Sequence, residues 1–512
     1  MTLLQWFIFF LAVQVIHYLG TWKLYQKAGR KKWEAAVPVY NAVILMKIIR
    51  KPAYWAILLF IPIVNLIMFP VVWVLTLKSF GKKSSLDTIL GIVTLGFYIY
   101  YINYVEDVKY ITQEEYEAEK KKESTLGSLL FAVVVATIVH TYVMQPFTIP
   151  TASLEKTLLI GDFLFVSKFH YGARTPMTTV ALPMVHDSVP VVNTKSYLSW
   201  PQLPSFRFPG FEKPEKNDIV VFNWPTDKRT DGTYKPIDKK TNYVKRCVGT
   251  PGDTLSIING TVYIDGKELQ LSDRAKIQYF HTIYIKPGTL SSQQVYQILH
   301  QNGSTEFWPG KSENTVMANL TLEGAEKIKS ITGIDSIVKY ISPAEDTKVF
   351  PHTKPTWSGD NIGAIYIPEA GKTVSLTKET LPFYEDIIKE YEGNKLQVIG
   401  NEIRINGEIA TSYTFKQNYY WMMGDNRHNS LDSRYWGFVP QDHIVGKPVF
   451  IWMSLDQNVP WKNFSKKVRW DRMFTTVGGE GKPVSYFKYF LILLAGWFVF
   501  DYFRKKKKKA AI

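Results

Sequence analysis

The chain has 512 residues, a formal net charge of +16 at pH 7 and one cysteine. This length exceeds one typical domain, so we expect a globular core and a second unit. A single cysteine excludes an intramolecular disulfide, and the apolar neighbours of Cys247 predict a small buried side chain rather than a reactive thiol. The charge alone would suit a nucleic-acid-binding protein, but much of it flanks apolar segments, as at residues 120–122 and 504–509. That pattern favours membrane topology, and we predict no nucleic-acid partner.

The N-terminal part of the chain contains uncharged apolar runs at about residues 3–22, 53–77, 88–105 and 126–144. Each approaches the roughly 20 residues that cross a bilayer. The first run lacks the basic start and the small-residue cleavage site of a secretory signal peptide, so we interpret it as an anchor. We therefore predict a multispanning membrane region of unknown role over residues 1–122 and a transmembrane anchor over 126–145.

Basic residues set the expected orientation of these spans. Lysines at 120–122 in the cytoplasm would place residue 146 outside, and the chain could return only through the apolar tail. We predict a C-terminal transmembrane helix over 486–503 and a basic cytoplasmic tail over 504–512, with a position in the membrane interface as the alternative. If successive spans alternate in direction, Lys78, Lys82 and Lys83 would lie outside the membrane, although basic residues favour the cytoplasmic side. The topology of the first hundred residues therefore stays open.

Residues 146–485 form a polar stretch with short β-branched segments between turn residues, which predicts a mostly β domain beside α-helical transmembrane segments. Segments 257–266 and 398–407 share an alternating pattern that ends in Gly, and both predict β-hairpins. Segments 172–215 and 270–395 carry no catalytic pattern and are interpreted as insertions or an accessory β-subdomain. A weak repeat, Pro38-Val-Tyr-Asn41 and Pro62-Ile-Val-Asn65, occurs in the membrane region.

The first candidate for chemistry is Ser153, in Ile149-Pro-Thr-Ala-Ser-Leu-Glu-Lys-Thr-Leu-Leu-Ile-Gly-Asp162, a few residues after the expected membrane exit. Alone, Thr151 or Ser153 would be interpreted as a helix N-cap. The second candidate is Lys245, which alternates with apolar residues on an expected strand. If it faces inward, burial lowers its pKa, and a neutral amine can take the proton of a serine hydroxyl. Alternatively Lys245 faces solvent.

The third candidate segment, Met422-Met-Gly-Asp-Asn-Arg-His-Asn-Ser-Leu-Asp-Ser-Arg-Tyr-Trp-Gly-Phe-Val-Pro440, concentrates carboxylates, arginines and amides. It could be an exposed loop, but the apolar residues around it favour burial, where Asp and Arg must pair. In this order, the three segments resemble the signature boxes of type I signal peptidases, which are membrane-bound serine proteases with a Ser/Lys dyad.

The resemblance implies a role for each matching residue. Ser153 would be the nucleophile and Lys245 the general base, while the Ser153 N–H and the Thr151 hydroxyl would form the oxyanion hole. Ser430 would orient the lysine, and Asp425, Asn426, Arg427, Asp432 and Arg434 would form the scaffold behind the dyad. The substrate would add as a strand before the nucleophile. Its shallow pockets would be lined by Phe147, Ile149, Leu154, Leu158, Leu164, Val221, Tyr243 and Val244, and would accept an Ala-x-Ala sequence.

Glu155 and Lys156 depart from the family pattern, which usually has a residue followed by proline at this point. They create a Ser153-x-x-Lys156 tetrad like that of penicillin-binding proteins. We reject that class because no Lys-Thr-Gly or Lys-Ser-Gly follows, and we expect Lys156 to be a solvated residue in the first turn of a helix.

We therefore expect a multi-pass enzyme of the bacterial cytoplasmic membrane, with its peptidase domain on the extracytoplasmic side. It would remove signal peptides from exported preproteins and require no cofactor and no metal. The lipid bilayer and export machinery are further expected partners. A self-cleaving Ser/Lys repressor would be soluble and DNA-binding, which the apolar segments disfavour. A non-catalytic membrane scaffold is the other alternative, for which Ser153→Ala would have no effect.

Overall fold

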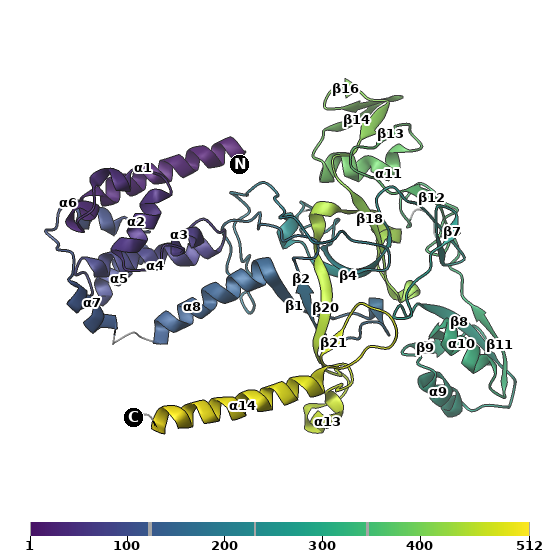
Figure 1. Ribbon diagram of the computed structural model, residues 1–512. Coiled ribbons are helices and arrows are strands. Elements are labelled where there is room, and N and C mark those ends of the chain that lie inside the picture. Colours follow the sequence, from purple (N-terminus) through teal and green to yellow (C-terminus); the bar gives the residue numbers. More distant parts are fainter. Residues whose placement is uncertain (1, 121–124, 230–231, 345–347, 511–512) are drawn as a thin grey trace. The chain divides into compact units, whose positions relative to one another are not determined.

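The computed structural model describes residues 2–120, 125–229, 232–344 and 348–510. By its contacts the chain divides into two compact units, the first with residues 1–144 and 173–208 and the second with residues 145–172 and 209–512. The first unit is mainly helical and the second contains the large β-sheet (Figure 1). The loop 173–208 therefore groups with the N-terminal helices rather than with the sheet that flanks it in sequence. The lysines at 121 and 122 lie outside the described residues.

Short helices make up the first unit, because several of the predicted apolar runs are interrupted. The helices are α1 (Leu3–Lys27), α2 (Tyr40–Ile48), α3 (Trp55–Leu58), α4 (Val64–Ser79), α5 (Ser85–Val93), α6 (Tyr98–Tyr104), α7 (Gln113–Lys120) and α8 (Thr125–Ile138), which a π-turn extends to Val143. The run at 53–77 breaks before α4, and the run at 88–105 bends by 115° between α5 and α6. The break before α4 contains a residue at positive φ, Ile63, and the bend contains Leu95 and Gly96 at positive φ.

The repeated Pro-x-x-Asn sequence corresponds to a repeated backbone turn. Val39 and Ile63 adopt nearly equal angles, φ 67° with ψ −48° and φ 68° with ψ −45°, directly before α2 and α4. In both copies the asparagine N–H donates to the carbonyl four residues earlier, at 2.9 Å. Positive φ is strained for a β-branched residue, so the same costly conformation at both sites shows that the repeat is structural.

Among the described residues, α1 is long and apolar enough to cross a membrane, and the bent pair α5 and α6 would supply a second crossing if the pair acts as one span. The helices α4 and α8, the latter with its π-turn, are apolar but shorter. The structure thus shows one candidate span, where the sequence predicted several.

The loop 173–208 packs within the first unit through buried side chains. Ala181 and Tyr197 of the loop form a small apolar cluster with Ile63, the strained residue before α4. The Trp6 indole Nε1 donates to the Gln202 carbonyl at 3.0 Å. Cys247, in the second unit, is fully buried as predicted.

The second unit is built on a sheet with the strand order β1, β2, β20, β3, β4, β18, β19, in which β21 also pairs with β20. These strands are β1 (Met144–Thr148), β2 (Asp162–Ser167), β3 (Ile219–Asn223), β4 (Asn242–Gly249), β18 (Tyr419–Met423), β19 (Val439–Pro440), β20 (Ile444–Ser454) and β21 (Thr475–Thr476). Strands β3 and β18 are fully buried and almost wholly apolar, and β4 between them is buried from Lys245 to Gly249. The mostly β catalytic domain predicted from the sequence is confirmed.

Smaller sheets extend from this core. One sheet has the order β12, β5, β6, β7, and it contains the predicted hairpin of β5 (Thr254–Ile258) and β6 (Thr261–Ile264). The second predicted hairpin pairs β14 (Leu396–Ile399) with β15 (Glu402–Ile405). The remaining strands here are β7 (Lys267–Glu268), β12 (Ile362–Tyr366), β13 (Thr373–Ser375), β16 (Glu408–Ile409) and β17 (Ser412–Thr414).

The segment 278–339 forms a compact subdomain of its own. Its sheet has the order β11, β8, β10, β9, with α9 (Ser292–Gln301) and α10 (Leu322–Lys329) packed on it through the buried residues Val295, Leu299 and Ile328. The strands are β8 (Gln278–Ile285), β9 (Phe307–Pro309), β10 (Thr315–Thr321) and β11 (Ile334–Lys339). The expected accessory β-subdomain is thus a mixed α and β structure.

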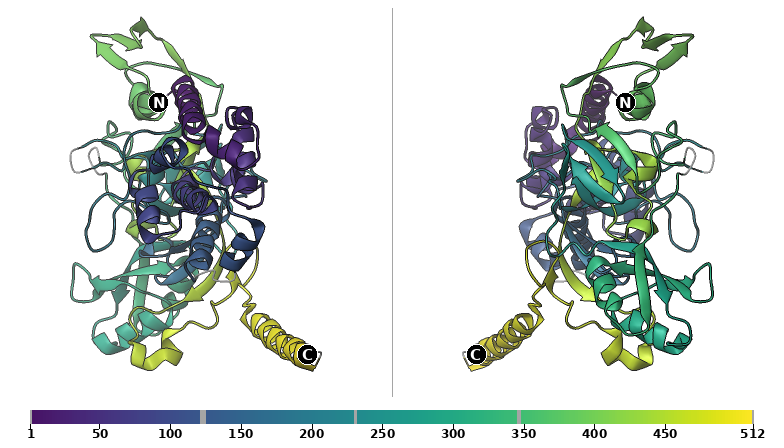
Figure 2. Two further views of the ribbon diagram at one scale, coloured as in Figure 1. Left: turned by 90° about the vertical axis from the view of Figure 1, so that its left-hand side faces the viewer. Right: turned by 90° about the vertical axis from the view of Figure 1, so that its right-hand side faces the viewer.

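The chain ends in the long helix α14 (Phe487–Ala510), which projects from the second unit as a single element in both side views (Figure 2). Its apolar side chains, among them Trp497 and Phe500, are exposed. A helix that is apolar and unpacked along most of its length is typical of a segment that meets lipid. The short helices α11 (Leu381–Asp386), α12 (Ser433–Trp436) and α13 (Phe464–Lys467) complete the unit.

Candidate active site

Ser153 lies in a short 3-10 turn, Ala152–Leu154, that directly follows the edge strand β1. The side chain is buried, with 8% of the residue exposed. The third predicted segment holds this turn in place, because the Asn426 backbone N–H donates to the Ser153 carbonyl at 3.1 Å and the Asn426 side-chain Nδ2 donates to the Ala152 carbonyl at 3.2 Å. Asn426 therefore fixes the backbone on which the serine stands.

Lys245 reaches Ser153 from the middle of β4. Its Nζ donates to the Ser153 Oγ at 2.7 Å, although the two residues are 92 positions apart in sequence. Lys245 is 5% exposed, and burial lowers the pKa of its amine to about 8 against the opposing attraction of Asp432 and Asp425. At neutral to slightly alkaline pH a substantial fraction of the amine is therefore uncharged and able to accept a proton.

A second buried lysine shows how specific this arrangement is. Burial also lowers the pKa of Lys240 to about 8. Its Nζ, however, donates to the Pro225 carbonyl at 2.5 Å and lies 3.1 Å from the His443 Nε2. A lowered lysine pKa alone therefore does not distinguish the two residues, and the short contact with a serine hydroxyl does.

Two buried ion pairs support the dyad, and one of them includes an arginine, Arg246, that the sequence analysis did not assign to the scaffold. Arg434 pairs with Asp432 as expected, with Nε and Oδ1 2.9 Å apart. Asp425 binds Arg246 instead of Arg427, through two contacts of 2.7 and 2.6 Å. Burial would raise the pKa of the Asp425 carboxyl, but the Arg246 guanidinium outweighs this and holds the pKa below its ordinary value. Arg427 donates to the Gly260 carbonyl at 3.1 Å.

Sequence reasoning missed Arg246 and Thr157 as supporting residues. Thr157 donates its hydroxyl to the second Asp425 oxygen at 2.6 Å, so the turn after the nucleophile is tied to the same carboxylate. The sequence could have indicated Arg246, because successive side chains of a strand point to opposite faces. If Lys245 faces the serine, Arg246 must lie on the other face of β4.

Ser430 and Thr151, the other two residues predicted to assist the dyad, differ in their exposure to solvent. The Ser430 hydroxyl is buried without a hydrogen-bond partner among the described residues. Thr151 is exposed, and its hydroxyl does not cap the turn. Glycine is required at 424, because a Cβ there would lie 2.3 Å from the Ser430 Oγ and 2.6 Å from the Ser153 carbonyl oxygen. Gly424 thus separates Ser430 from the nucleophile turn, and no described hydrogen bond joins Ser430 to Lys245.

Most of the predicted pocket residues share one apolar cluster. It contains Phe147, Ile149, Leu154, Leu158, Leu164, Val221 and Val244. Tyr243 belongs to a different cluster, where it stacks on Trp224 with ring centroids 5.2 Å apart. The ring of Tyr243 also lies 5.2 Å from the Lys245 Nζ, so Tyr243 contacts the dyad rather than the aliphatic wall.

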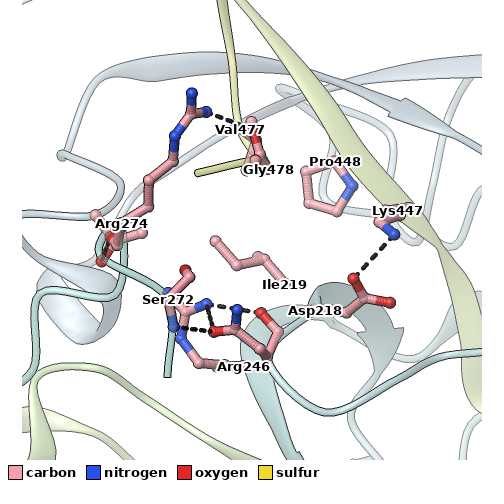
Figure 3. A pocket seen from close by; sticks show the side chains of 12 residues that line it. Asp218, Ile219, Arg246, Ser272, Arg274, Lys447, Pro448, Val477 and Gly478 are labelled. Atoms are coloured by element: carbon pink, nitrogen blue, oxygen red, sulfur yellow. Dashed lines mark hydrogen bonds and ion pairs between the residues drawn. The ribbon is translucent and has the colours of Figure 1, made fainter. Parts of the chain in front are cut away.

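A small cavity of about 80 Å³ lies around Arg246 (Figure 3). Its lining also includes Asp218, Ser272, Arg274 and Lys447, and neither Ser153 nor Lys245 belongs to it. The Lys447 ammonium pairs with Asp218 at 2.9 Å. This cavity therefore adjoins the support of the dyad and not the dyad itself.

Lys156 does not have the predicted environment. The residue is only partly exposed and lies in a turn with φ +68°, whereas the sequence analysis expected a solvated residue in a helical first turn. The expectation is wrong because the helical segment ends at Leu154.

The comparison with known families decides the identity of this unit. The family described as signal peptidase, peptidase S26, matches residues 122–316 and 363–453, which is more than half of the chain. The chain belongs to this signal peptidase family. It is accordingly a serine endopeptidase, and its substrates are preproteins that carry signal peptides. Residues 33–113 match a separate family of unknown function (DUF5684).

Individual signal peptidases I show the same relationship over most of their length. The protein of Buchnera aphidicola subsp. Acyrthosiphon pisum is 28% identical over 350 residues, which cover 68% of this chain and 81% of the relative. The signal peptidase I of Helicobacter pylori is 26% identical over 378 residues, covering 70% and 94%. That of Haemophilus influenzae is 24% identical over 374 residues, covering 69% and 75%.

Proposed function

We propose that the enzyme cleaves preproteins by a Ser/Lys dyad, with Ser153 as the nucleophile and Lys245 as the general base. The observation that carries this proposal is the contact of 2.7 Å between a buried amine with a lowered pKa and a serine hydroxyl. Neutral Lys245 takes the Ser153 proton as the Oγ attacks the scissile carbonyl, and the resulting ammonium gives that proton to the leaving amine. The same amine then activates a water molecule, which hydrolyses the acyl-enzyme.

We assign the oxyanion hole to the Ser153 N–H and the Thr151 hydroxyl. Thr151 directly precedes the turn and its hydroxyl caps no helix, so it is free to rotate toward a bound carbonyl. Ser430 would orient the Lys245 amine. Its buried hydroxyl lacks a partner in the described chain, which suits a group that pairs only when the amine shifts during the reaction.

For the substrate we propose a strand that adds along β1 with small side chains at the positions before the scissile bond, as in Ala-x-Ala. An edge strand offers unpaired backbone groups to an extended peptide. Ile149, Leu154 and Leu158 are almost fully buried in the cluster next to it, so their branched side chains fill the space that a larger substrate side chain would need.

We further propose a multi-pass protein of the bacterial cytoplasmic membrane with the peptidase unit outside. The candidate span α1, the bent pair α5 and α6, the apolar helix α8 and the exposed helix α14 support this arrangement. The lipid bilayer and the export machinery would be its partners. Deleting residues 1–120 and measuring preprotein processing in membranes tests whether the N-terminal region contributes to cleavage or only to recruitment.

The catalytic assignment is tested by cleavage of a preprotein with an Ala-x-Ala site by the purified full-length chain. Ser153→Ala and Lys245→Ala should each abolish cleavage. Lys240→Ala is the matched control, because it removes a buried lysine of the same lowered pKa that does not contact Ser153. Full activity in either dyad variant, with the control also active, would disprove the mechanism.

A further inference from the structure

The loop 173–208 is a long, irregular hairpin. Isolated antiparallel bridges join its two arms at Arg174 with Arg207, Thr178 with Gln202, Ala181 with Tyr197, and Ser188 with Lys195. At the tip, the Val189 N–H donates to the Thr194 carbonyl at 2.8 Å. Val191, between them, is 98% exposed and has φ 76°, a strained conformation for a β-branched residue. Packing inside the chain does not explain a strained and fully exposed valine, whereas contact with an apolar partner would.

The hairpin packs against one end of the helical unit. The Trp6 indole Nε1, near the start of α1, donates to the Gln202 carbonyl at 3.0 Å. Ile63, directly before α4, shares an apolar cluster with two hairpin side chains. The ring centroid of Tyr142, in the π-turn that ends α8, lies 6.4 Å from that of Phe208. The starts of α1 and α4 and the end of α8 therefore meet at this end of the unit, which we call the hairpin end (Figure 1).

Charged groups gather at the opposite end of the unit, which we call the basic end. The Lys27 Nζ, at the end of α1, lies 3.5 Å from the Asp107 Oδ1. The Ile111 N–H donates to the carbonyl of Ser79, the last residue of α4, at 3.0 Å. The Arg50 guanidinium, just after α2, donates to the Ile111 carbonyl at 2.7 Å. The ends of α1, α2 and α4 thus lie together, and lysines and arginines cluster around them in the sequence, at 23–32, 47–51 and 78–83.

The bent pair α5 and α6 begins and finishes at the basic end. Lys82, before α5, forms an ion pair with Glu106, after α6, and the chain bends by 115° between the two helices. A segment that returns to the end from which it started is a re-entrant hairpin rather than a span. With the pair counted in this way, the lysines at 78, 82 and 83 fall on the same side as those that follow α1. The conflict with the positive-inside rule is thereby removed.

The difference in charge between the two ends gives the unit a direction. Segments 1–22 and 52–77, which include the starts of α1 and α4, contain no Asp, Glu, Lys or Arg. The positive-inside rule therefore assigns the basic end to the cytoplasm and the hairpin end to the outer side. Chain connectivity gives the same answer independently, because the hairpin lies in sequence between β2 and β3 of the peptidase unit, which we propose to be outside.

The exposed surface of the hairpin is suited to lipid. Its exposed apolar side chains include Met184, Val191, Val192, Leu198, Trp200 and Phe206. Tryptophan is enriched where a protein passes between headgroups and acyl chains. The apolar surface is continuous with that of α1, because Phe7 and Ile8 are also exposed and follow Trp6, which bonds to the hairpin. A patch that extends the apolar surface of a candidate span at its outer end is best matched by the outer leaflet of the bilayer.

We infer that the hairpin 173–208 docks into the outer leaflet, with lipid as its partner. It caps a helical unit whose N-terminus lies outside and whose helices α5 and α6 enter and leave the membrane on the cytoplasmic side. This inference rests on the proposed extracytoplasmic position of the peptidase unit. It assigns to the hairpin the role of a further membrane contact for that unit.

The direction of the unit is tested by labelling single cysteines, because Cys247, the one native cysteine, is fully buried. Thr2→Cys, Ser85→Cys and the reference Glu313→Cys place a thiol at exposed positions of the full-length chain. In spheroplasts treated with a membrane-impermeant maleimide, we expect label at positions 2 and 313, label at 85 only after permeabilisation, and none on the wild-type chain. Absence of label at 313 would contradict the proposed orientation of the peptidase unit. Label at 313 without label at 2, or label at 85 in intact spheroplasts, would overturn the inference alone.

The lipid contact is tested with a fluorophore on Val191→Cys or Leu198→Cys in proteoliposomes of phosphatidylethanolamine and phosphatidylglycerol. A nitroxide near the top of the acyl chain should quench both probes severalfold more than a probe on Glu313→Cys, because interfacial side chains reach roughly 5–10 Å into the boundary between headgroups and acyl chains. Equal quenching at all three positions would overturn the docking. A hairpin probe that is shielded from aqueous iodide but not quenched by the lipid nitroxide would show a protein occupant instead, and would also overturn it.

Discussion

Replacement of Lys245 by Met should stabilise the folded protein while it abolishes catalysis. Burial lowers the pKa of this amine from 10.5 to about 8. Such a difference corresponds to about 3 kcal/mol by which the charged, buried amine destabilises the fold at any pH below 8. Methionine has a similar shape and no charge, but it leaves the Ser153 hydroxyl without its partner, which costs about 1 kcal/mol. The expected net gain at pH 7 is therefore about 2 kcal/mol.

The gain should depend on pH in a defined direction. Between pH 8 and 10.5 the unfolded chain binds the proton that the folded chain has released, so the stability of the wild-type protein rises with pH across this window. The advantage of Lys245→Met should accordingly shrink above pH 8, disappear at about pH 9.5 and reverse at higher pH.

The assay is chemical or thermal unfolding of the full-length chain in detergent micelles, at pH 7 and at pH 10. The control is Lys240→Met, whose amine also donates to a backbone carbonyl, so that its removal leaves a buried acceptor unpaired and should give a smaller gain. A Lys245→Met variant that is no more stable than the wild type at pH 7, or that is equally favoured at both pH values, would refute the reasoning.

Three further outcomes are expected. The kcat/KM for a preprotein peptide should rise with pH and level off above a midpoint near 8, because protonated Lys245 cannot accept the serine proton, and a profile flat from pH 6 to 9 would contradict this. Arg246→Met should lower stability by about 3–5 kcal/mol, since it leaves the buried Asp425 carboxylate unpaired, whereas Arg404→Met at the exposed pair with Glu402 should change it by less than about 1 kcal/mol in the same urea titration. Lys156→Gly should be more stable than Lys156→Ala by about 1 kcal/mol, because both remove the ammonium and only glycine relieves the strain at φ +68°, and equal stabilities would show that the turn is unstrained.

The sequence predicted those parts of the fold that short-range pattern controls. Alternation and turn residues located both hairpins, and the buried environment of Cys247 followed from its neighbours. The grouping of Ser153 with Lys245 was predicted from family resemblance, and the structure places the two groups in contact.

The remaining features depend on contacts that no local pattern records. Asp425 was predicted to belong to the scaffold without a named partner, and its partner is Arg246, which is 179 positions away and arrives on a neighbouring strand. The apolar run at 53–77 gave no sign of the break at Ile63, because hydropathy does not report a positive φ. The helical first turn expected for Lys156 was wrong because the sequence likewise gave no sign of the positive φ at this residue.

The strand order of the main sheet also governs when the enzyme can become active during its own synthesis. Strand β20 lies between β2, which follows the nucleophile, and β3, which pairs with the strand of Lys245. The two halves of the dyad are therefore joined through residues 444–454, near the end of the peptidase unit. Contacts of such large sequence separation form slowly, because a long loop must close before they yield any stabilisation. A nascent chain that ends before residues 444–454 therefore lacks the strand that joins β2 to β3 in the main sheet, even though Ser153 and Lys245 have already been synthesised.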